Sequence, residues 1–191
     1  MAQAPLTVRH WTRTEYERLI DLGAFDREPI ELIGGQLIVA EPQNPYHVTG
    51  IGKSGDTIRA AIPPGFIVRI QAPIAIDDES VPEPDIVVVR GRHEDYLRSH
   101  PRRPDLVIEV SDSSLRFDRV EKGSLYARGG VLDYWIVNIV DRVVEIYRDP
   151  QPDPPAPYGW RHGSVETHAA PAIVVPLAFP SIQIAVADLI C

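Results

Sequence analysis

Cysteine is almost absent from this chain, which carries one thiol, Cys191, in 191 residues. A single cysteine excludes an intrachain disulfide and a zinc site built on several cysteines. No apolar run approaches the roughly 18 residues that a membrane-spanning helix needs. Residues 1–10 contain no apolar segment of the kind found in signal peptides. Together these absences lead us to expect a cytoplasmic protein that does not cross a membrane.

Positive charge is scarce as well, since 27 acidic residues outnumber 19 lysines and arginines and give a formal net charge of −8. Lysine and arginine supply the affinity of proteins for nucleic-acid phosphates, so this balance counts against loose, sequence-independent DNA binding. It does not exclude a nuclease, because carboxylates clustered around a metal ion would themselves make the total acidic.

Apolar material is sufficient for a folded core. Hydrophobic residues make up 44% of the chain, and its composition is not that of a disordered protein. The length is slightly above that of a usual domain, and no internal repeat is present. We therefore expect one domain over residues 1–191.

The N-terminal part predicts a helix followed by a hairpin. Residues 12–23 begin with the capping-box pattern Thr-x-x-Glu and end at a glycine. Two strand-like runs, 30–33 and 36–41, flank Gly34 and Gly35, which form a strong two-residue hairpin signal.

Further along the chain, short and almost continuously apolar runs predict strands buried on both faces of a sheet. The expected helices cover residues 44–63 and 116–128. The expected strands cover residues 66–70, 73–76, 85–89, 106–110, 134–138, 143–148 and 182–186, with a proline-rich surface loop at 150–157. This order predicts an α/β or α+β fold, in which a mixed central sheet is flanked by helices and preceded by an antiparallel hairpin.

Three acidic residues stand in or beside these apolar strands. Asp85 follows a proline at a strand start, while Glu109 and Glu31 lie inside strands. A buried carboxylate is unfavourable unless it is paired, hydrogen-bonded or bound to metal. Taken singly, Asp85 is more typical of a turn, Glu31 of an exposed strand, and Lys122 of a solvated helix surface. For Glu109 alone, a structural role and a functional role are evenly balanced.

Taken together, the four residues fit one mechanism. Hard divalent cations such as Mg²⁺ bind through one or two carboxylates, waters and substrate phosphate oxygens. Asp85 and Glu109 on neighbouring strands would provide two such carboxylates, and the metal would polarise a phosphate and acidify a water molecule. Lys122 would orient that water and stabilise negative charge if its helix packs across the strand that carries Glu109.

The residues around these positions resemble a known nuclease family. Pro84-Asp85 followed by Glu109-Val110-Ser111 is similar to the PD-(D/E)xK nuclease superfamily, although Ser111 stands where the superfamily usually has lysine. More specifically, the chain resembles the Uma-two (DUF820-like) family of restriction-type endonucleases over nearly its whole length. The matching segments are 31–37, 45–47, 84–89, 104–111, the helix with Asp118, Lys122 and Tyr126, and 130–137.

The resemblance implies a restriction-endonuclease-like fold and a Mg²⁺- or Mn²⁺-dependent endonuclease acting on DNA. It implies that Asp85 and Glu109 are metal ligands and that the Val110 carbonyl is a further ligand. Glu31 is then an extra acid that binds through water or a second ion, and the lysine has moved to the next helix as Lys122. Superfamily members that cut both strands often pair, so we expect a homodimer by analogy.

Further residues are candidate substrate contacts. His47 matches a recurrent histidine of the family, and we weigh phosphate contact or proton transfer equally against a structural role at a helix end. Arg119 and Tyr126 share a face with Lys122 at helical spacing, although a tyrosine there more often packs in the core. The connection between the acid-bearing strands is also basic, which suits a nucleic-acid backbone or, equally, a solvated loop. Its basic residues are Arg90, Arg92, His93, Arg98, His100, Arg102 and Arg103.

Three functions remain open on the sequence. The first is a metal-dependent deoxyribonuclease, which is favoured because a binding module has no need to keep these acids and the lysine together. The second is a non-catalytic descendant of the fold that binds protein or nucleic acid. A weaker third is a metal-dependent hydrolase of another phosphate ester. A serine hydrolase is not supported, because no Gly-x-Ser-x-Gly elbow occurs.

Overall fold

The structure of the protein, a computed structural model, describes residues 7–26, 28–40 and 42–191. Its centre is a six-stranded sheet with the order β3-β4-β5-β6-β7-β8. The strands are β3 (Phe66–Ile70), β4 (Ile86–Arg90), β5 (Leu106–Ser111), β6 (Asp133–Asn138), β7 (Val143–Pro152) and β8 (Trp160–Ala169). All neighbours pair antiparallel except β5 and β6, which are parallel. The predicted mixed sheet is therefore confirmed.

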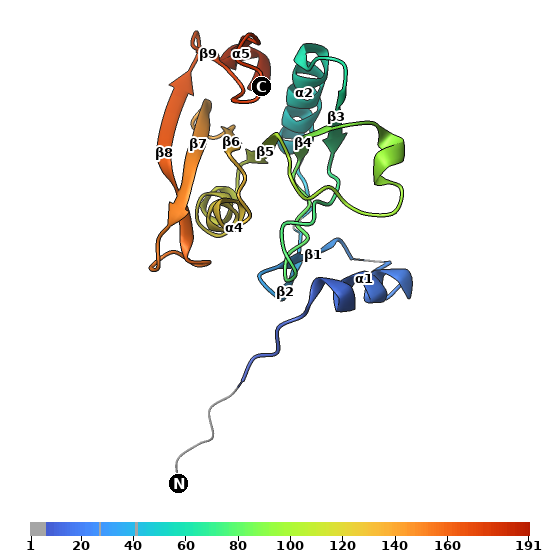
Figure 1. Cartoon of the computed structure of the whole chain (residues 1–191). Helices are drawn as coiled ribbons and strands as arrows, with labels where there is room; N and C mark the ends of the chain where they lie inside the picture. The colour runs from blue at the N-terminus through green and yellow to red at the C-terminus, as the bar shows by residue number, and fades with distance from the viewer. Residues whose placement is uncertain (1–6, 27, 41) are drawn as a thin grey trace.

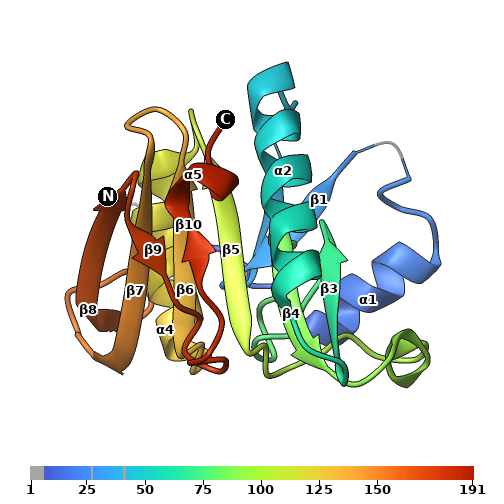
Figure 2. The ribbon, with the colours of Figure 1, turned by 90° about the horizontal axis from the view of Figure 1, so that it is seen from above.

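Helices cover both faces of this sheet (Figures 1 and 2). One face carries α2 (Pro45–Ala61), α5 (Val186–Leu189) and the small hairpin of β9 (Ile173–Val174) and β10 (Ile184–Ala185). The other face carries α3 (Leu115–Phe117), the π-helical turn η2 (Asp118–Lys122) and α4 (Gly123–Arg128). A single 3₁₀ turn, η1 (His93–Tyr96), lies in the connection between β4 and β5.

Alternate residues of the central strands pack toward the two faces, as expected for strands buried on both sides. Toward α2, Ile108 packs with Ile58 in one apolar cluster. Toward α4, Val107 packs with Tyr126 in another. Glu109 is two residues after Val107, so its side chain faces α4 as well.

The parallel pairing of β5 and β6 determines what lies over Glu109. Parallel neighbours need a crossover connection, which here consists of residues 112–132 and includes η2 and α4. Because the crossover packs on one face of the sheet, it carries Lys122 across the strand that holds Glu109.

The N-terminal part forms a separate unit of helix and hairpin below the sheet in Figure 1. It comprises α1 (Arg13–Asp21), with the predicted capping box, and the hairpin strands β1 (Ile30–Ile33) and β2 (Gln36–Val39). Gly34 and Gly35 have φ angles of 56° and 79°, in the left-handed region that a two-residue hairpin turn requires. The Val81 N–H donates to the Leu32 carbonyl at 2.7 Å, which ties the hairpin to the segment before β4.

Most predicted elements are confirmed with shifts of a few residues at their ends, namely α1, the β1–β2 hairpin, α2 and strands β3 to β7. Residue 41, the predicted end of the second hairpin strand, lies outside the described residues. So do residues 1–6, over which we expected no signal peptide. In the parts of the chain that the structure describes, no helix combines the length and apolarity needed to cross a bilayer.

Several predicted boundaries are wrong. Residues 73–76 are not a strand, because the N–H groups of Ile74 and Ala75 donate to loop carbonyls instead of a strand ladder. The proline-rich loop 150–157 begins later than predicted, since β7 continues to Pro152. Beyond Arg148, β7 pairs with β8 alone. Pro150 and Pro152 therefore do not interrupt the hydrogen bonds between β6 and β7. The run 182–186 divides between β10 and α5, and β8 was not predicted.

Gly50 and Gly52 of α2 provide a matched test of how tightly this helix packs over β5. A Cβ added at Gly50 would lie 2.9 Å from Val110 Cγ1, whereas a Cβ at Gly52 would meet nothing within 4 Å. We expect Gly52→Ala to raise the free energy of unfolding by up to about 1 kcal/mol through helix propensity. Gly50→Ala adds an overpacking penalty of about 1–3 kcal/mol. Chemical denaturation measures both, and equal shifts would contradict the close approach.

Candidate functional site

Asp85 and Glu109 lie side by side at one end of the central strand pair. β4 and β5 pair Ile86 with Ile108, so the next position sets Asp85 opposite Glu109. The Asp85 N–H donates to Glu109 Oε2 at 3.4 Å, and the Val110 N–H donates to Asp85 Oδ2 at 2.8 Å. Each strand's backbone thus holds the other strand's carboxylate, and the two residues are 7% and 2% exposed.

The crossover brings two further groups to Glu109. Lys122 Nζ lies 3.0 Å from Glu109 Oε1, and the Tyr126 hydroxyl donates to the same oxygen at 2.7 Å. Residues four apart on a helix share a face, which is why both reach one carboxylate. Tyr126 is fully buried and its hydroxyl holds Glu109 in place. This agrees with the expectation that a tyrosine here packs in the core, and it does not favour the alternative of a substrate contact.

Lys122 ends a π-helical turn, and this turn separates it from Arg119. A π turn contains one more residue than an α turn, so it changes which side chains share a face. Arg119 turns to β7, where its Nε donates to Glu145 Oε2 at 2.9 Å, and it does not line the cavity that contains Lys122. The predicted shared face of Arg119 with Lys122 is therefore wrong, and Arg119 is part of a separate ion pair.

The N-terminal hairpin supplies another acid. Glu31 Oε2 lies 3.8 Å from Lys122 Nζ and accepts a hydrogen bond from the Glu83 N–H at 3.0 Å. Burial, and then the negative charge of Glu31, raise the pKa of the Glu83 carboxyl group. Lys122 therefore faces carboxylates that come from both the central sheet and the hairpin.

His47 stands in the first turn of α2, where the Asn44 side chain caps the helix by accepting from the His47 N–H at 3.0 Å. Its Nε2 lies 3.5 Å from Asp85 Oδ1, and its Nδ1 lies 3.9 Å from Asp112 Oδ1. Hydrogen bonding to Asp85 raises the pKa of the imidazole, against the opposing effect of burial. The helix thus directs a basic group at one of the two strand acids.

These groups line one cavity of about 640 Å³. Among the lining residues that the structure describes, Lys122 and His47 are the only basic ones. Six acids face them: Glu31, Glu83, Asp85, Glu109, Asp112 and Asp118. Burial raises the pKa of the Glu109 carboxyl well above its ordinary value, and Asp85 adds to the rise although Lys122 opposes it. The cavity therefore brings together more carboxyl groups than basic groups.

The oxygen atoms of this cavity suit a hard divalent cation. Within the part of the chain that the structure describes, the one hydrogen bond to Glu109 Oε2 is the 3.4 Å contact from the Asp85 N–H, and Asp85 Oδ1 faces His47 at 3.5 Å. Within the described residues, no three His, Cys, Asp or Glu side chains form a ready-made metal cage. Mg²⁺ binds through only one or two carboxylates and completes its shell with water and substrate oxygens. Asp85 and Glu109 therefore fit such an ion.

The family of the chain follows from a match over most of its length. A family model described as "putative restriction endonuclease" matches residues 13–187. The chain belongs to the Uma2 family. The family resemblance seen in the sequence is thereby confirmed, and the description of the family names a nuclease activity.

A solved structure shares the fold of this Uma2 protein. The crystal structure of "a putative nuclease belonging to DUF820 from Anabaena variabilis ATCC 29413" has a TM-score of 0.65 and 20% identity, over 84% of this chain and 88% of that chain. At this identity the likeness establishes the fold. A comparison with curated proteins found no match.

Most residues predicted for the Uma2 site meet at the cavity. Those that line it are Glu31, His47, Asp85, Glu109 and Lys122. Val110 supplies its N–H to Asp85. The candidates outside the described lining are Val110, Arg119 and Tyr126.

Sequence reasoning assigned no role to Asp118, although this acid also lines the cavity. It accepts hydrogen bonds from the Ser111 hydroxyl at 2.7 Å and the Ser114 hydroxyl at 2.6 Å. Ser111 thus occupies the usual lysine position of the superfamily and anchors the start of the crossover instead. The sequence offered one indication that Asp118 belongs to the site, because this residue lies in the helix segment that resembles the family.

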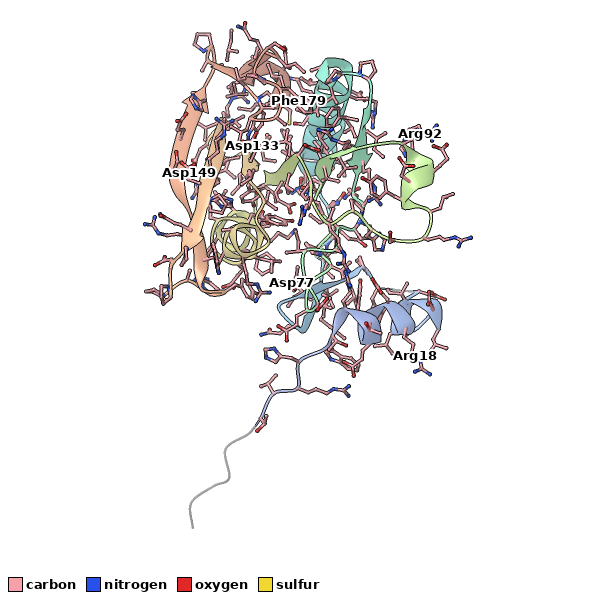
Figure 3. All side chains as sticks on the ribbon, viewed as in Figure 1. Arg18, Asp77, Arg92, Asp133, Asp149 and Phe179 are labelled. Atoms are coloured by element: carbon pink, nitrogen blue, oxygen red, sulfur yellow. The ribbon has the colours of Figure 1, made fainter. Side chains whose placement is uncertain are left out.

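The basic connection between β4 and β5 does not border this cavity, so of the two alternatives left open by the sequence, a nucleic-acid contact beside the acids is not favoured. It leaves β4 at Arg90, at the opposite end from Asp85, and Arg92 lies on its outer side (Figure 3). None of its seven basic residues is among the described residues that line the cavity. Arg98, His100 and Arg102 instead line a second hollow of about 550 Å³ beside α1.

The chain's two lysines allow a direct test of the buried pair. Burial lowers the pKa of Lys122, but Glu109 and the other carboxylates outweigh burial and raise it well above its ordinary value. In Glu109→Gln the nearest carboxylate is lost, so the pKa of Lys122 is expected to fall. Side-chain NMR titration with isotope-labelled lysine measures this, with Lys53 as the internal reference. A Lys122 pKa that does not change would contradict the pairing.

Proposed function

We propose that the protein is a metal-dependent endonuclease that hydrolyses phosphodiester bonds in DNA with Mg²⁺ or Mn²⁺. The observation that carries the proposal is the 3.0 Å contact of Lys122 with Glu109, beside Asp85, in a cavity of about 640 Å³. Buried carboxylates in excess of their counterions are unfavourable unless a cation joins them. Membership of the Uma2 family supports the nuclease class.

In this proposal Asp85 and Glu109 would hold the cation, and the Val110 carbonyl would be a further ligand. Glu31 would bind the same cation through a water molecule, or would bind a second cation. When bound, the cation polarises the phosphate and lowers the pKa of water. The oxygen of water bonds to phosphorus, the P–O ester bond breaks, and one proton of that water ends on the leaving oxygen. When both strands are cut, two copies of the chain act as a homodimer.

Lys122 has the role of stabilising charge and orienting water. Its raised pKa keeps the ammonium group protonated at neutral pH, where it offsets the negative charge that develops on the phosphate oxygens. His47, beside Asp85, contacts the phosphate or moves a proton. Tyr126 is a positioning residue, because it acts on Glu109 and not on the substrate.

Asp85 and Asp105 form a matched pair for testing the metal ligands, since each follows a proline directly before a central strand. Asp85→Asn is expected to reduce cleavage by at least about a hundredfold, because charge stabilisation through the metal is worth several kcal/mol. Asp105→Asn changes an acid outside the cavity and should cleave like the unchanged chain. Plasmid cleavage with Mg²⁺, Mn²⁺ or EDTA measures both. Cleavage that persists in EDTA or in Asp85→Asn would refute the metal role.

Substitution of the lysine separates catalysis from metal binding. Lys122→Met is expected to lower kcat by about 10²–10³-fold, the range found when one donor to a developing oxyanion is lost. It should keep the rise in Tm that Mg²⁺ causes, whereas Glu109→Ala should lose both the rise and the cleavage. Lys53→Met, which removes a lysine bonded to the carbonyls of Ala187 and Ile190, is the control.

The same measurements test the alternative of a non-catalytic module. A Mg²⁺-dependent rise in Tm without cleavage of any DNA would favour a binding protein that has kept the metal site. If Glu109→Ala retains the metal-induced rise in Tm, the assigned ligands are wrong.

A further inference from the structure

The cavity has a second, apolar part that the proposed hydrolysis does not use. Asp85, Glu109 and Lys122 form its charged floor. The apolar wall comes from β2, from the segments that flank the hairpin, and from one aromatic ring of α3. Its members are Pro29, Ile38, Val39, Ala40, Pro42 and Phe117.

We propose that this wall receives the base of a single unstacked nucleotide whose phosphate lies at the charged floor. The substrate is then single-stranded or locally melted DNA, and an intact duplex is cleaved poorly. This inference rests on the proposed function and adds to it the form of DNA that enters the site.

The hairpin register places the apolar wall beside the charged floor. Ile38 pairs directly with Glu31 across the hairpin, so both side chains lie on the same face. Glu31 is 3.8 Å from Lys122, and Ile38 lines the same cavity. One side of the hairpin thus presents an acid to the phosphate end of the cavity and an apolar side chain next to it.

The depth of the floor argues against an intact duplex. The side chains of Asp85, Glu109 and Lys122 are 10%, 3% and 9% exposed, whereas Val39 in the wall is 57% exposed. The cavity volume of about 640 Å³ lies within the roughly 300–1,000 Å³ of small-ligand sites. A double helix does not fit into such a space. Enzymes that take a base into a pocket remove that nucleotide from the stack.

Two carboxamides in the lining are available to the edge of a base. Gln43 and Gln71 line the cavity, and neither side chain is hydrogen-bonded to another residue of the described chain. Gln71 has a φ of 45°, an uncommon value for a residue other than glycine, and its N–H donates to the Asp85 carbonyl at 2.9 Å. Such backbone conformations persist where the surroundings hold them, often at functional sites. Carboxamides both donate and accept, as base edges do.

The distribution of positive charge also favours a nucleotide over a duplex. Proteins that hold a duplex by its backbone place several lysines or arginines along it. Of the residues described around the cavity, only Lys122 and His47 are basic, and Arg98 and Arg102 line the separate hollow. The base must therefore supply part of the affinity, and stacking on an aromatic ring does so with any base.

The first experiment compares three DNA substrates of one sequence with the full chain and Mg²⁺ or Mn²⁺. They are a single strand, a perfect duplex, and a duplex with an unpaired loop at its centre. We expect kcat/KM for the single strand and the looped duplex to exceed that for the perfect duplex by at least about tenfold, because unstacking costs free energy in the paired substrate.

The second experiment measures binding without cleavage and compares two neighbouring apolar residues. Phe117 lines the cavity, whereas Val120 is 41% exposed and is not part of its described lining. With Glu109→Gln as the background, fluorescence anisotropy of a labelled single strand is expected to show about tenfold weaker binding for Phe117→Ala. Val120→Ala should bind like the background, and the salt dependence of binding should be shallow.

The outcomes separate this inference from the proposed function. Equal cleavage of all three substrates, with no effect of Phe117→Ala on binding, would overturn the nucleotide pocket and leave the endonuclease intact. Binding that prefers the single strand and needs Phe117, without cleavage of any substrate, would support the pocket and overturn the catalytic function. If there is neither cleavage nor single-strand binding, both proposals fail.

Discussion

The contact between Lys122 and Glu109 is the constraint around which the rest of the site is arranged. Two charges held away from water are unfavourable unless further hydrogen bonds satisfy them, and loss of one partner leaves the other charge uncompensated. The Tyr126 hydroxyl and the Asp85 N–H supply those bonds. The parallel pairing of β5 with β6 is equally necessary, because it forces a crossover over the face that Glu109 occupies. Local hydrogen bonding and overall topology thus serve the same ion pair.

The acidic composition of the chain has a specific meaning in this arrangement. The cavity gathers acids from the hairpin, the central strands and the crossover, and it opposes them with one lysine and one histidine. None of the arginines that the structure describes lines the cavity, and Arg119 forms an ion pair with Glu145. The net charge of −8 is therefore compatible with a phosphate substrate, provided that a cation mediates the contact.

The two strand acids could be predicted from the sequence because carboxylates are conspicuous in apolar runs. The role of Lys122 depended on its helix packing across the strand of Glu109, and the family resemblance added support for it. The side chain of Arg119 was predicted on the wrong face because α-helical spacing was assumed for this segment. No local sequence pattern indicates the π turn that ends at Lys122. The position of the basic connection could not be predicted from its nearness in sequence to both acid-bearing strands. It joins the ends of β4 and β5 that lie opposite Asp85 and Glu109. β8 was missed because it is an edge strand on which most side chains are exposed. Its sequence therefore shows no regular alternation of apolar and polar residues.

The π turn of η2 determines how Asp118 and Lys122 are oriented relative to each other. Each residue of an α-helix advances the direction of its side chains by about 100°, and the wider π turn advances it by less. If the same five residues were wound as an ordinary α-helix, Lys122 would be rotated relative to Asp118. Either the ammonium group would leave Glu109 or the Ser111 and Ser114 hydroxyls would lose Asp118. A change in the winding of this one turn, without any change of sequence, would therefore disassemble the site.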